Sequence, residues 1–405
     1  MKRKKLWVLS GAILIAVILA VMPIMAGCAE PAPPEVKTLK IGCLMNFEFP
    51  LGVDCVNELE ALVPVFNEKG GLVIDGERYN IDLIIYDSKF DPPTARAAVE
   101  RLIYQDKVKF ILGDETTDSW LPITEENKVL VVANSPSPAL LSPDHKYVFQ
   151  SSSLHTNPPS VFGWFVENYP DMKTFVALFT DDLKGHAEAN MLRYLCDVFD
   201  RELLDVIHYP PDCTDFSAFA TRLAELNPDV YTTCAGGPVQ DALSMKGMKE
   251  AGWEGQILLY VALSPEAIGK VISLEFVEGM IAVTVATELP SPSPIAKELK
   301  DAYIAKHGSW PTPVILHVNT WYCLMEALKQ AQSLDVDEVA AVIANGLRFE
   351  TPQAPAVMIS RPDLGNPRTI DALYQAYMIR VEGGKAKLID TISLDKALEN
   401  VEKTF

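Results

Sequence analysis

From Lys40 onward, short apolar runs alternate with helical patterns, and this alternation limits the possible fold more than any other feature of the sequence. Brief apolar runs bounded by turn residues are typical of buried strands, and apolar residues repeated every three or four positions are typical of helices. Strands that alternate with helices build a parallel sheet with helices on both faces. We therefore expect an α/β fold.

The first half of the chain predicts one doubly wound unit. A strand over about 39–45 is followed by a helix that ends at Gly70-Gly71, because glycine is favoured just after the last helical residue. The next helix opens at Asp91-Pro92. Further strands are expected over 81–86, 110–112 and 129–133.

A second unit begins after the Ser/Pro-rich stretch 151–159 and repeats the same pattern. We expect its strands over 175–179, 204–208, 230–234 and 257–261, and its helices over 186–199, 214–226 and 239–251. The helix at 214 has Thr214 as its expected N-cap, with the acid Asp215 near its positive end. Two similar units in tandem indicate two lobes rather than one large sheet.

The C-terminal third has too few elements for a third core, so we expect it to complete the two lobes. It shows two amphipathic helices near 295–306 and 318–332, then irregular Pro-rich sequence, then a hairpin-like pair across Gly383-Gly384. The expected limits are 38–152 for lobe 1, 153–284 for lobe 2, 285–355 for a return to lobe 1 and 356–405 for a return to lobe 2.

The N-terminus has the pattern of a lipoprotein export signal. Basic residues at positions 2–5 precede an apolar run over 6–25, and Met25-Ala26-Gly27-Cys28 places small residues before a cysteine, as a lipoprotein signal peptidase requires. We expect a signal peptide over 1–27, a lipid on Cys28 and a Pro-rich spacer over 28–37. An uncleaved membrane anchor is the alternative, because about 20 apolar residues can span a bilayer. Pro23 and the register of the cysteine favour cleavage.

The net charge disfavours nucleic acid as a partner. The chain has 35 basic and 54 acidic residues, a formal charge of −19, and residues 1–27 contain four of the basic residues and no acidic one. The mature body is therefore still more acidic and should be repelled by phosphate backbones.

No motif for catalysis, a metal or a cofactor is present. GxGxxG, P-loop, GxSxG and HExxH patterns are absent, and the six histidines are dispersed. The six cysteines after Cys28 show no CxxC pairing, which argues against zinc and redox sites. Disulfides between Cys43 and Cys55 or between Cys213 and Cys234 are one possibility, and buried free thiols are another. We expect no enzyme, no cofactor and no metal.

Seven segments resemble one known family. They are KIGCLM, FNEKGGLVIDGERYNIDLIIYDSKFDP, FILGDET, PITEENKVLVVANSPSPAL, TDDLKG, TDFSAF and SPEAIG. In this order they resemble the type I periplasmic solute-binding proteins of ABC transporters, in the leucine/isoleucine/valine-binding branch, over about 38–392. The resemblance implies two Rossmann-like lobes, joined by three crossovers, that close on a ligand in the cleft. It also implies delivery of the solute to the membrane subunits of a permease.

The resemblance also implies where the ligand binds. Hydroxyl-rich loops after the third and fourth strands hold the carboxylate of the solute in this family, and hydroxyls suit an anionic oxygen. The matching residues are Thr116, Thr117, Ser135 and Ser137. The acid that binds the ammonium group of the ligand in this family matches Glu266. Glu266 could instead be a solvated acid at the start of a helix. Asp182 follows a strand, where α/β folds gather ligand-binding groups, although a helix cap fits equally well.

Two departures from the family change the expected ligand. Lys184 stands where an aromatic residue is usual before a glycine, and Pro238 stands where another aromatic is common. A cation on the cleft wall would favour a ligand with an additional negative or carbonyl group, unless Lys184 simply points to solvent. Phe47, Phe49 and Trp120 are candidates for the apolar wall, or for ordinary packing.

These observations predict an extracytoplasmic, lipid-anchored solute-binding protein of an ABC importer, for an amino acid or a related small carboxylate or amide. The alternative is a ligand-sensing receptor component of the same fold. A sensor would need a transmembrane relay or a partner domain, and none follows Phe405 in this sequence.

Overall fold

The structure is a computed structural model that describes residues 36–47, 50–135, 137–152, 155–234, 236–261, 265–311 and 317–405. Cys28, the leader and most of the spacer lie outside the described residues, as does Phe49. Residues 38–405 form one compact unit. None of the helices in the described ranges combines the length and the hydropathy that a membrane span needs.

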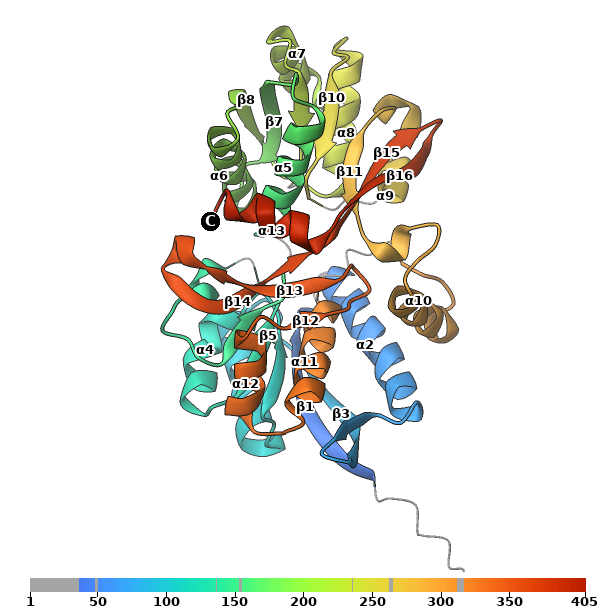
Figure 1. Ribbon diagram of the computed structural model, residues 1–405. Helices are drawn as coiled ribbons and strands as arrows, with labels where there is room; N and C mark the ends of the chain where they lie inside the picture. The colour runs from blue at the N-terminus through green and yellow to red at the C-terminus, as the bar shows by residue number, and fades with distance from the viewer. Residues whose placement is uncertain are drawn as a thin grey trace, which may run out of the picture. The chain divides into compact units, whose positions relative to one another are not determined.

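Lobe 1 is built on a mixed sheet with the order β12-β13-β14-β6-β5-β4-β1-β3-β2 (Figure 1). Its strands are β1 (Val36–Met45), β2 (Leu72–Ile74), β3 (Glu77–Asp87), β4 (Phe110–Gly113), β5 (Leu130–Ala133), β6 (Val148–Gln150), β12 (Arg348–Phe349), β13 (Ala356–Arg361) and β14 (Asn366–Tyr374). The central strands β1, β4, β5 and β6 are parallel neighbours. The expected parallel α/β arrangement is confirmed.

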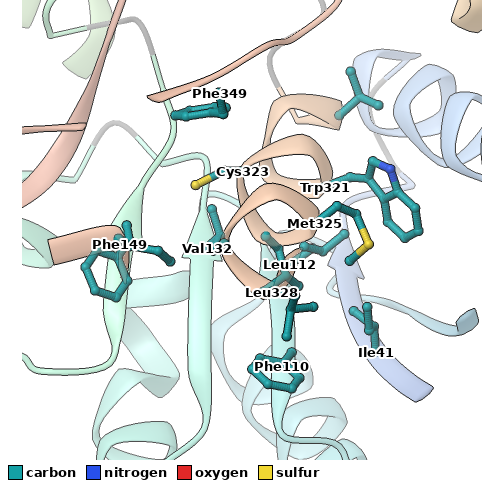
Figure 2. Close-up of a cluster of buried hydrophobic side chains, with 14 of the residues drawn as sticks. Ile41, Phe110, Leu112, Val132, Phe149, Trp321, Cys323, Met325, Leu328 and Phe349 are labelled. Atoms are coloured by element: carbon teal, nitrogen blue, oxygen red, sulfur yellow. The ribbon is translucent and has the colours of Figure 1, made fainter. Parts of the chain in front are cut away.

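Helices cover both faces of the lobe 1 sheet. They are α2 (Pro50–Glu68), α3 (Pro92–Arg101), α4 (Thr117–Glu126), α10 (Pro294–His307), α11 (Val318–Ala331) and α12 (Val336–Ala344). The helix α3 opens after Asp91 as expected, and Asp91 caps it, since its carboxylate accepts from the N–H of Thr94. Figure 2 shows Trp321, Met325 and Leu328 of α11 among the side chains of the buried core over β1, β4 and β5.

Lobe 2 is built on a second mixed sheet with the order β16-β15-β11-β10-β9-β7-β8. Its strands are β7 (Thr174–Thr180), β8 (Glu202–Tyr209), β9 (Val230–Thr232), β10 (Gln256–Leu259), β11 (Ile281–Thr284), β15 (Ala376–Glu382) and β16 (Lys385–Ile392). Its helices are α5 (Asn157–Asn168), α6 (Leu183–Val198), α7 (Ser217–Glu225), α8 (Pro238–Glu250), α9 (Pro265–Gly269) and α13 (Leu394–Glu402). Apolar clusters lie on both faces of this sheet.

The start of α7 corrects one local expectation. The helix begins at Ser217 rather than at Thr214. The carboxylate of Asp215 accepts from the N–H and the hydroxyl of Ser217, at 3.0 and 2.7 Å. Asp215 therefore satisfies the amino end of the helix from two residues upstream, and Thr214 is not the cap.

The stretch expected to be irregular after α11 is instead ordered as α12 and the antiparallel ribbon β13–β14 (Figure 1). The expected return to lobe 2 at residue 356 is therefore wrong, because β14 joins the lobe 1 sheet beside β6. The ribbon alternates between two cores. One set of its side chains packs in lobe 1 (Ala356, Met358, Ala372 and Tyr374) and the other in lobe 2 (Val357, Ile359 and Leu373). The chain enters the lobe 2 sheet again only at β15.

Three connections join the sheets, and hydrogen bonds hold them against each other or against neighbouring segments. The N–H of Ala286, just after β11, donates to the carbonyl of Gln353 at 2.7 Å. The hydroxyl of Thr156 donates to the carbonyl of Ala372 at 2.7 Å. The hydroxyl of Tyr374 donates to the carbonyl of Ser151 at 2.6 Å. The crossing after β6 is thus bonded to the end of β14, from which the chain crosses to β15, and the crossing after β11 is bonded to the loop before β13.

Candidate functional site

Polar side chains gather at the carboxyl ends of the central strands of lobe 1. Asn46 follows β1, Ser88 follows β3, Asp114 follows β4 and Asn134 follows β5, and all four are buried. The order β4-β1-β3 places the topological switch point of the sheet between β1 and β4. Open α/β sheets bind ligands at this position, so this edge is the candidate site in lobe 1.

The threonines of the first candidate loop bond to their own loop. The Thr116 hydroxyl donates to Asp114 Oδ1 at 2.6 Å and accepts from Trp120 Nε1 at 3.2 Å. The Thr117 hydroxyl donates to the backbone carbonyl of Asp114 at 2.6 Å. Both threonines are buried. Their hydroxyl protons are therefore already engaged inside the protein.

The serines of the second candidate loop are engaged in the same way. The Ser135 hydroxyl lies 3.5 Å from the carbonyl of Glu115, to which it donates, and it accepts from the N–H of Ser137 at 3.2 Å. The Ser137 hydroxyl donates to Asp118 Oδ2 at 3.2 Å. The backbone N–H groups of all four candidate hydroxyl residues also have acceptors within the protein.

The structure brings Glu115 and His317 together, a pair that the sequence did not predict. Glu115 Oε1 lies 3.1 Å from His317 Nε2, at ion-pair distance, although the ring N–H is not aligned for a regular hydrogen bond. The His317 side chain is 3% exposed and that of Glu115 is 29% exposed. The only sequence signal was an acid inside a hydroxyl-rich loop, since His317 is one of six dispersed histidines.

The pair shifts both pKa values towards the charged forms. Burial disfavours a charged Glu115, but the imidazolium of His317 more than offsets this and lowers the pKa of Glu115 below its ordinary value. Burial likewise opposes a charged His317, and the neighbouring Glu115 still raises the pKa of His317. Each side chain therefore favours the charged form of the other.

In lobe 2, Asp182 acts as a helix cap. Its carboxylate accepts from the N–H of Gly185 at 2.8 Å and from the Thr180 hydroxyl at 3.0 Å, at the amino end of α6. The sequence allowed Asp182 to be either a ligand-binding residue or a helix cap, and the structure shows the cap. A ligand contact by Asp182 stays a prediction.

Lys184 lies in the first turn of α6 and is exposed, but its charge acts inward as well. Burial raises the pKa of Glu188 to about 7, and Lys184 opposes the rise. Burial also raises the pKa of Asp241 to about 6, with the hydroxyl of Thr233 and Lys184 opposing it. Lys184 therefore acts electrostatically on the partly buried Glu188 of its own helix and on the buried Asp241 of α8.

The aromatic candidates divide. Trp120 is fully buried in a lobe 1 cluster and bonds to Thr116, so it packs in the core rather than forming a wall. Phe47 is 42% exposed just after β1 and stays a candidate. Phe49 lies outside the described residues, and so does the side chain of Glu266. Pro238 is the first residue of α8.

The described ranges contain no group of histidines, cysteines and acids arranged to hold a metal ion. All six cysteines after Cys28 are free thiols, so the structure has neither of the two considered disulfides. Five of the six are buried, and burial raises the pKa of the thiols of Cys43 and Cys323. These cysteines are packing residues.

A family assignment follows from the sequence profile of the family described as "Periplasmic binding protein", which matches residues 46–385. The chain belongs to the periplasmic binding protein family. It is 25% identical over 317 residues to the leucine-, isoleucine-, valine-, threonine-, and alanine-binding protein of Pseudomonas aeruginosa. The matched residues make up 74% of this chain and 79% of that protein.

Solved structures share the fold. An ABC transporter substrate-binding protein from Sphaerobacter thermophilus has a TM-score of 0.71 at 18% identity, covering 88% of this chain and 98% of that one. A solute-binding protein of an ABC transporter from R. palustris, in complex with benzoate, has a TM-score of 0.63 at 18% identity, covering 88% and 96%.

The membership confirms the resemblance to type I proteins of the leucine/isoleucine/valine-binding branch. The protein is a periplasmic binding protein, an extracytoplasmic solute-binding component of transport and not an enzyme.

Proposed function

We propose that the protein is a lipid-anchored solute-binding protein of an ABC importer, for an amino acid or a related small carboxylate or amide. The observation that supports this most is the pair of polar carboxyl edges, one on each sheet, joined by the three crossings. The relative from Pseudomonas aeruginosa is named for five amino acids. The structural neighbour from R. palustris holds benzoate. Both ligands are small and carry a carboxylate.

The proposed mechanism is hinge closure. A ligand that contacts both lobes favours the closed form by its differential affinity for that form, and the membrane subunits of the permease recognise the closed form. The hydrogen bonds at the crossings, including Tyr374 to Ser151, keep the connections together while the lobes move.

A solute screen tests the transport role. Purified protein is melted in the presence of L-amino acids, their amides and aromatic acids, each at a high concentration. A ligand at a hundred times its dissociation constant should add about 2.7 kcal/mol to the free energy of unfolding, which corresponds to a rise in melting temperature of several degrees. If no member of the panel raises the melting temperature, the proposed function is wrong.

The anchor is a separate proposal, for residues outside the described ranges. We propose that residues 1–27 are removed, that Cys28 is lipidated and that 28–37 is a spacer. In a bacterial host grown with labelled palmitate, the wild-type chain should incorporate label and fractionate with membranes. Cys28→Ser should abolish the label and leave solute binding unchanged. Label retained by Cys28→Ser, or an intact leader in the wild-type protein, would show that the anchor is not a lipid on Cys28.

A further inference from the structure

The lobe 1 edge lacks the donors that a carboxylate ligand would need from the candidate hydroxyl loops. Each hydroxyl of Thr116, Thr117, Ser135 and Ser137 donates to an acceptor inside lobe 1. Their backbone N–H groups are used as well. A solute carboxylate arriving here would have to displace these internal bonds. The hydroxyl loops therefore do not present the free donors that the family pattern implied.

The same edge presents acceptors instead. The Glu115 side chain is 29% exposed, and its Oε1 contacts His317. The second carboxylate oxygen, Oε2, is not part of that contact. Beneath it, Asp114 is buried and accepts from the hydroxyls of Ser88 and Thr116. An incoming carboxylate has no N–H to donate to Glu115, whereas an amide, an amidinium or an ammonium group has one. The neighbouring His317 offsets part of the repulsion between Glu115 and an anion, so the missing donor is the main difference between these end groups.

Two buried donors lie at the same edge without hydrogen-bond partners among the described residues: Nδ2 of Asn134 and Nδ1 of His317 when that nitrogen is protonated. Asn134 is 2% exposed and His317 is 2% exposed. Asn134 follows β5, the strand next to β4, which leads into Glu115. Buried polar groups are rarely left unpaired. A ligand carbonyl that accepts from one of them, while its own N–H donates to Glu115, would satisfy both.

We propose that Glu115 is a specificity-determining residue that selects solutes whose lobe 1 end carries N–H donors, as a primary amide, an amidinium or an ammonium group, and rejects a free carboxylate at that end. This inference rests on the proposed solute-binding function and narrows its substrate class. It also reverses the polarity expected from the family pattern, in which the lobe 1 loops hold the carboxylate.

The test uses probes of equal shape and different charge. Benzoate, benzamide and benzamidine differ only in the end group, and so do 4-methylpentanoate and 4-methylpentanamide. Dissociation constants are measured by calorimetry on the mature protein. We expect the amide or the amidine to bind at least tenfold more tightly than the acid of the same series.

Two variants connect the preference to Glu115. Glu115→Gln keeps the shape and removes the charge, so benzamidine should weaken at least tenfold while benzoate strengthens. Glu126→Gln removes the same charge from the exposed carboxyl end of α4 and should bind like the wild type. Thermal melts of both variants show whether they are folded, and Glu115→Asp, which restores the charge, should recover part of the benzamidine affinity.

The outcomes separate the two proposals. Tighter binding of the acids in the wild type, or an unchanged preference in a folded Glu115→Gln, overturns the role of Glu115 and leaves the solute-binding function in place. Binding of no probe from either series, together with no response in the wider solute screen, overturns the solute-binding proposal and this inference with it.

Discussion

Replacing Arg361 with methionine is expected to lower the free energy of unfolding by about 3 kcal/mol, because it leaves a buried carboxylate without the guanidinium that is bonded to it. Arg361 Nη1 lies 2.8 Å from Asp371 Oδ2, and Asp371 is fully buried on β14. Burial raises the pKa of Asp371 above its ordinary value, even with His155 and Arg361 opposing the rise. Loss of the guanidinium removes part of what offsets that burial.

The other contacts of Arg361 are nearer the surface and should matter less. Its Nη2 lies 2.7 Å from Asp363, whose side chain is 23% exposed, and its guanidinium lies over the ring of Phe405 at 4.1 Å. Asp363 accepts two bonds from Arg361, from Nε at 2.9 Å and from Nη2 at 2.7 Å. Asp363→Asn keeps one acceptor on a partly exposed side chain and leaves no buried charge unpaired, so it should cost about 1 kcal/mol. It is therefore the matched control.

Urea unfolding at pH 7, followed by circular dichroism, measures both variants. Adding Asp371→Asn to Arg361→Met should recover part of the lost stability, because the double variant no longer contains the buried charge. Two results would show that the pair does not stabilise the β13–β14 ribbon. One is a loss below 1 kcal/mol for Arg361→Met. The other is that Asp371→Asn destabilises the Arg361→Met variant as much as it destabilises the wild type.

The position of this ribbon explains why the sequence predicted only part of the fold. Strands such as β4 and β7 are short apolar runs between turn residues, so their periodicity revealed them. The ribbon is different, because Val357 and Met358 face two different cores. A strand buried on both faces has no polar and apolar alternation. The prolines of this segment are also more typical of a loop than of a strand.

The sequence predicted where the candidate site lies, but not which groups it presents to a ligand. The carboxyl ends of β4 and β5 follow from the order of strands. A sequence cannot show whether the hydroxyl of Thr117 or Ser137 points to a ligand or to its own loop, since both use the same residue types. Glu115 and His317 are far apart in the chain, and only folding brings α11 to the end of β4.

Replacing Glu188 with glutamine is expected to remove a fall in stability that the wild-type protein shows as pH rises from about 4.5 to 7. Burial raises the pKa of Glu188 from 4.5 to about 7. The folded state therefore keeps a proton that the unfolded state has lost, and stability falls with pH across that window. Each pKa unit corresponds to about 1.4 kcal/mol. We expect the free energy of unfolding to fall by about 2 kcal/mol across this window, less than the full shift would give, because the Glu188 side chain is partly accessible to water.

The measurement is the free energy of unfolding at pH 5, 6, 7 and 8. Glu188→Gln should match the wild type at pH 5 and exceed it at pH 8, while Glu225→Gln, at the exposed end of α7, should follow the wild type throughout. Asp241, with its pKa raised to about 6, should leave a smaller slope between about pH 4 and pH 6 in the variant. A wild-type curve that is flat from pH 5 to pH 8 would contradict the buried state of Glu188.

Lys184 connects this titration to the ligand. Its charge lowers the pKa of both Glu188 and Asp241 against the effect of burial. Lys184→Met should therefore extend the fall in stability of the wild-type protein to higher pH. If it does, Lys184 is largely neutralised by two acids of its own lobe, and it has little charge left for an anionic ligand. If the pH profile is unchanged, the cation acts outward, and the hypothesis of a ligand with an additional negative or carbonyl group at lobe 2 gains support.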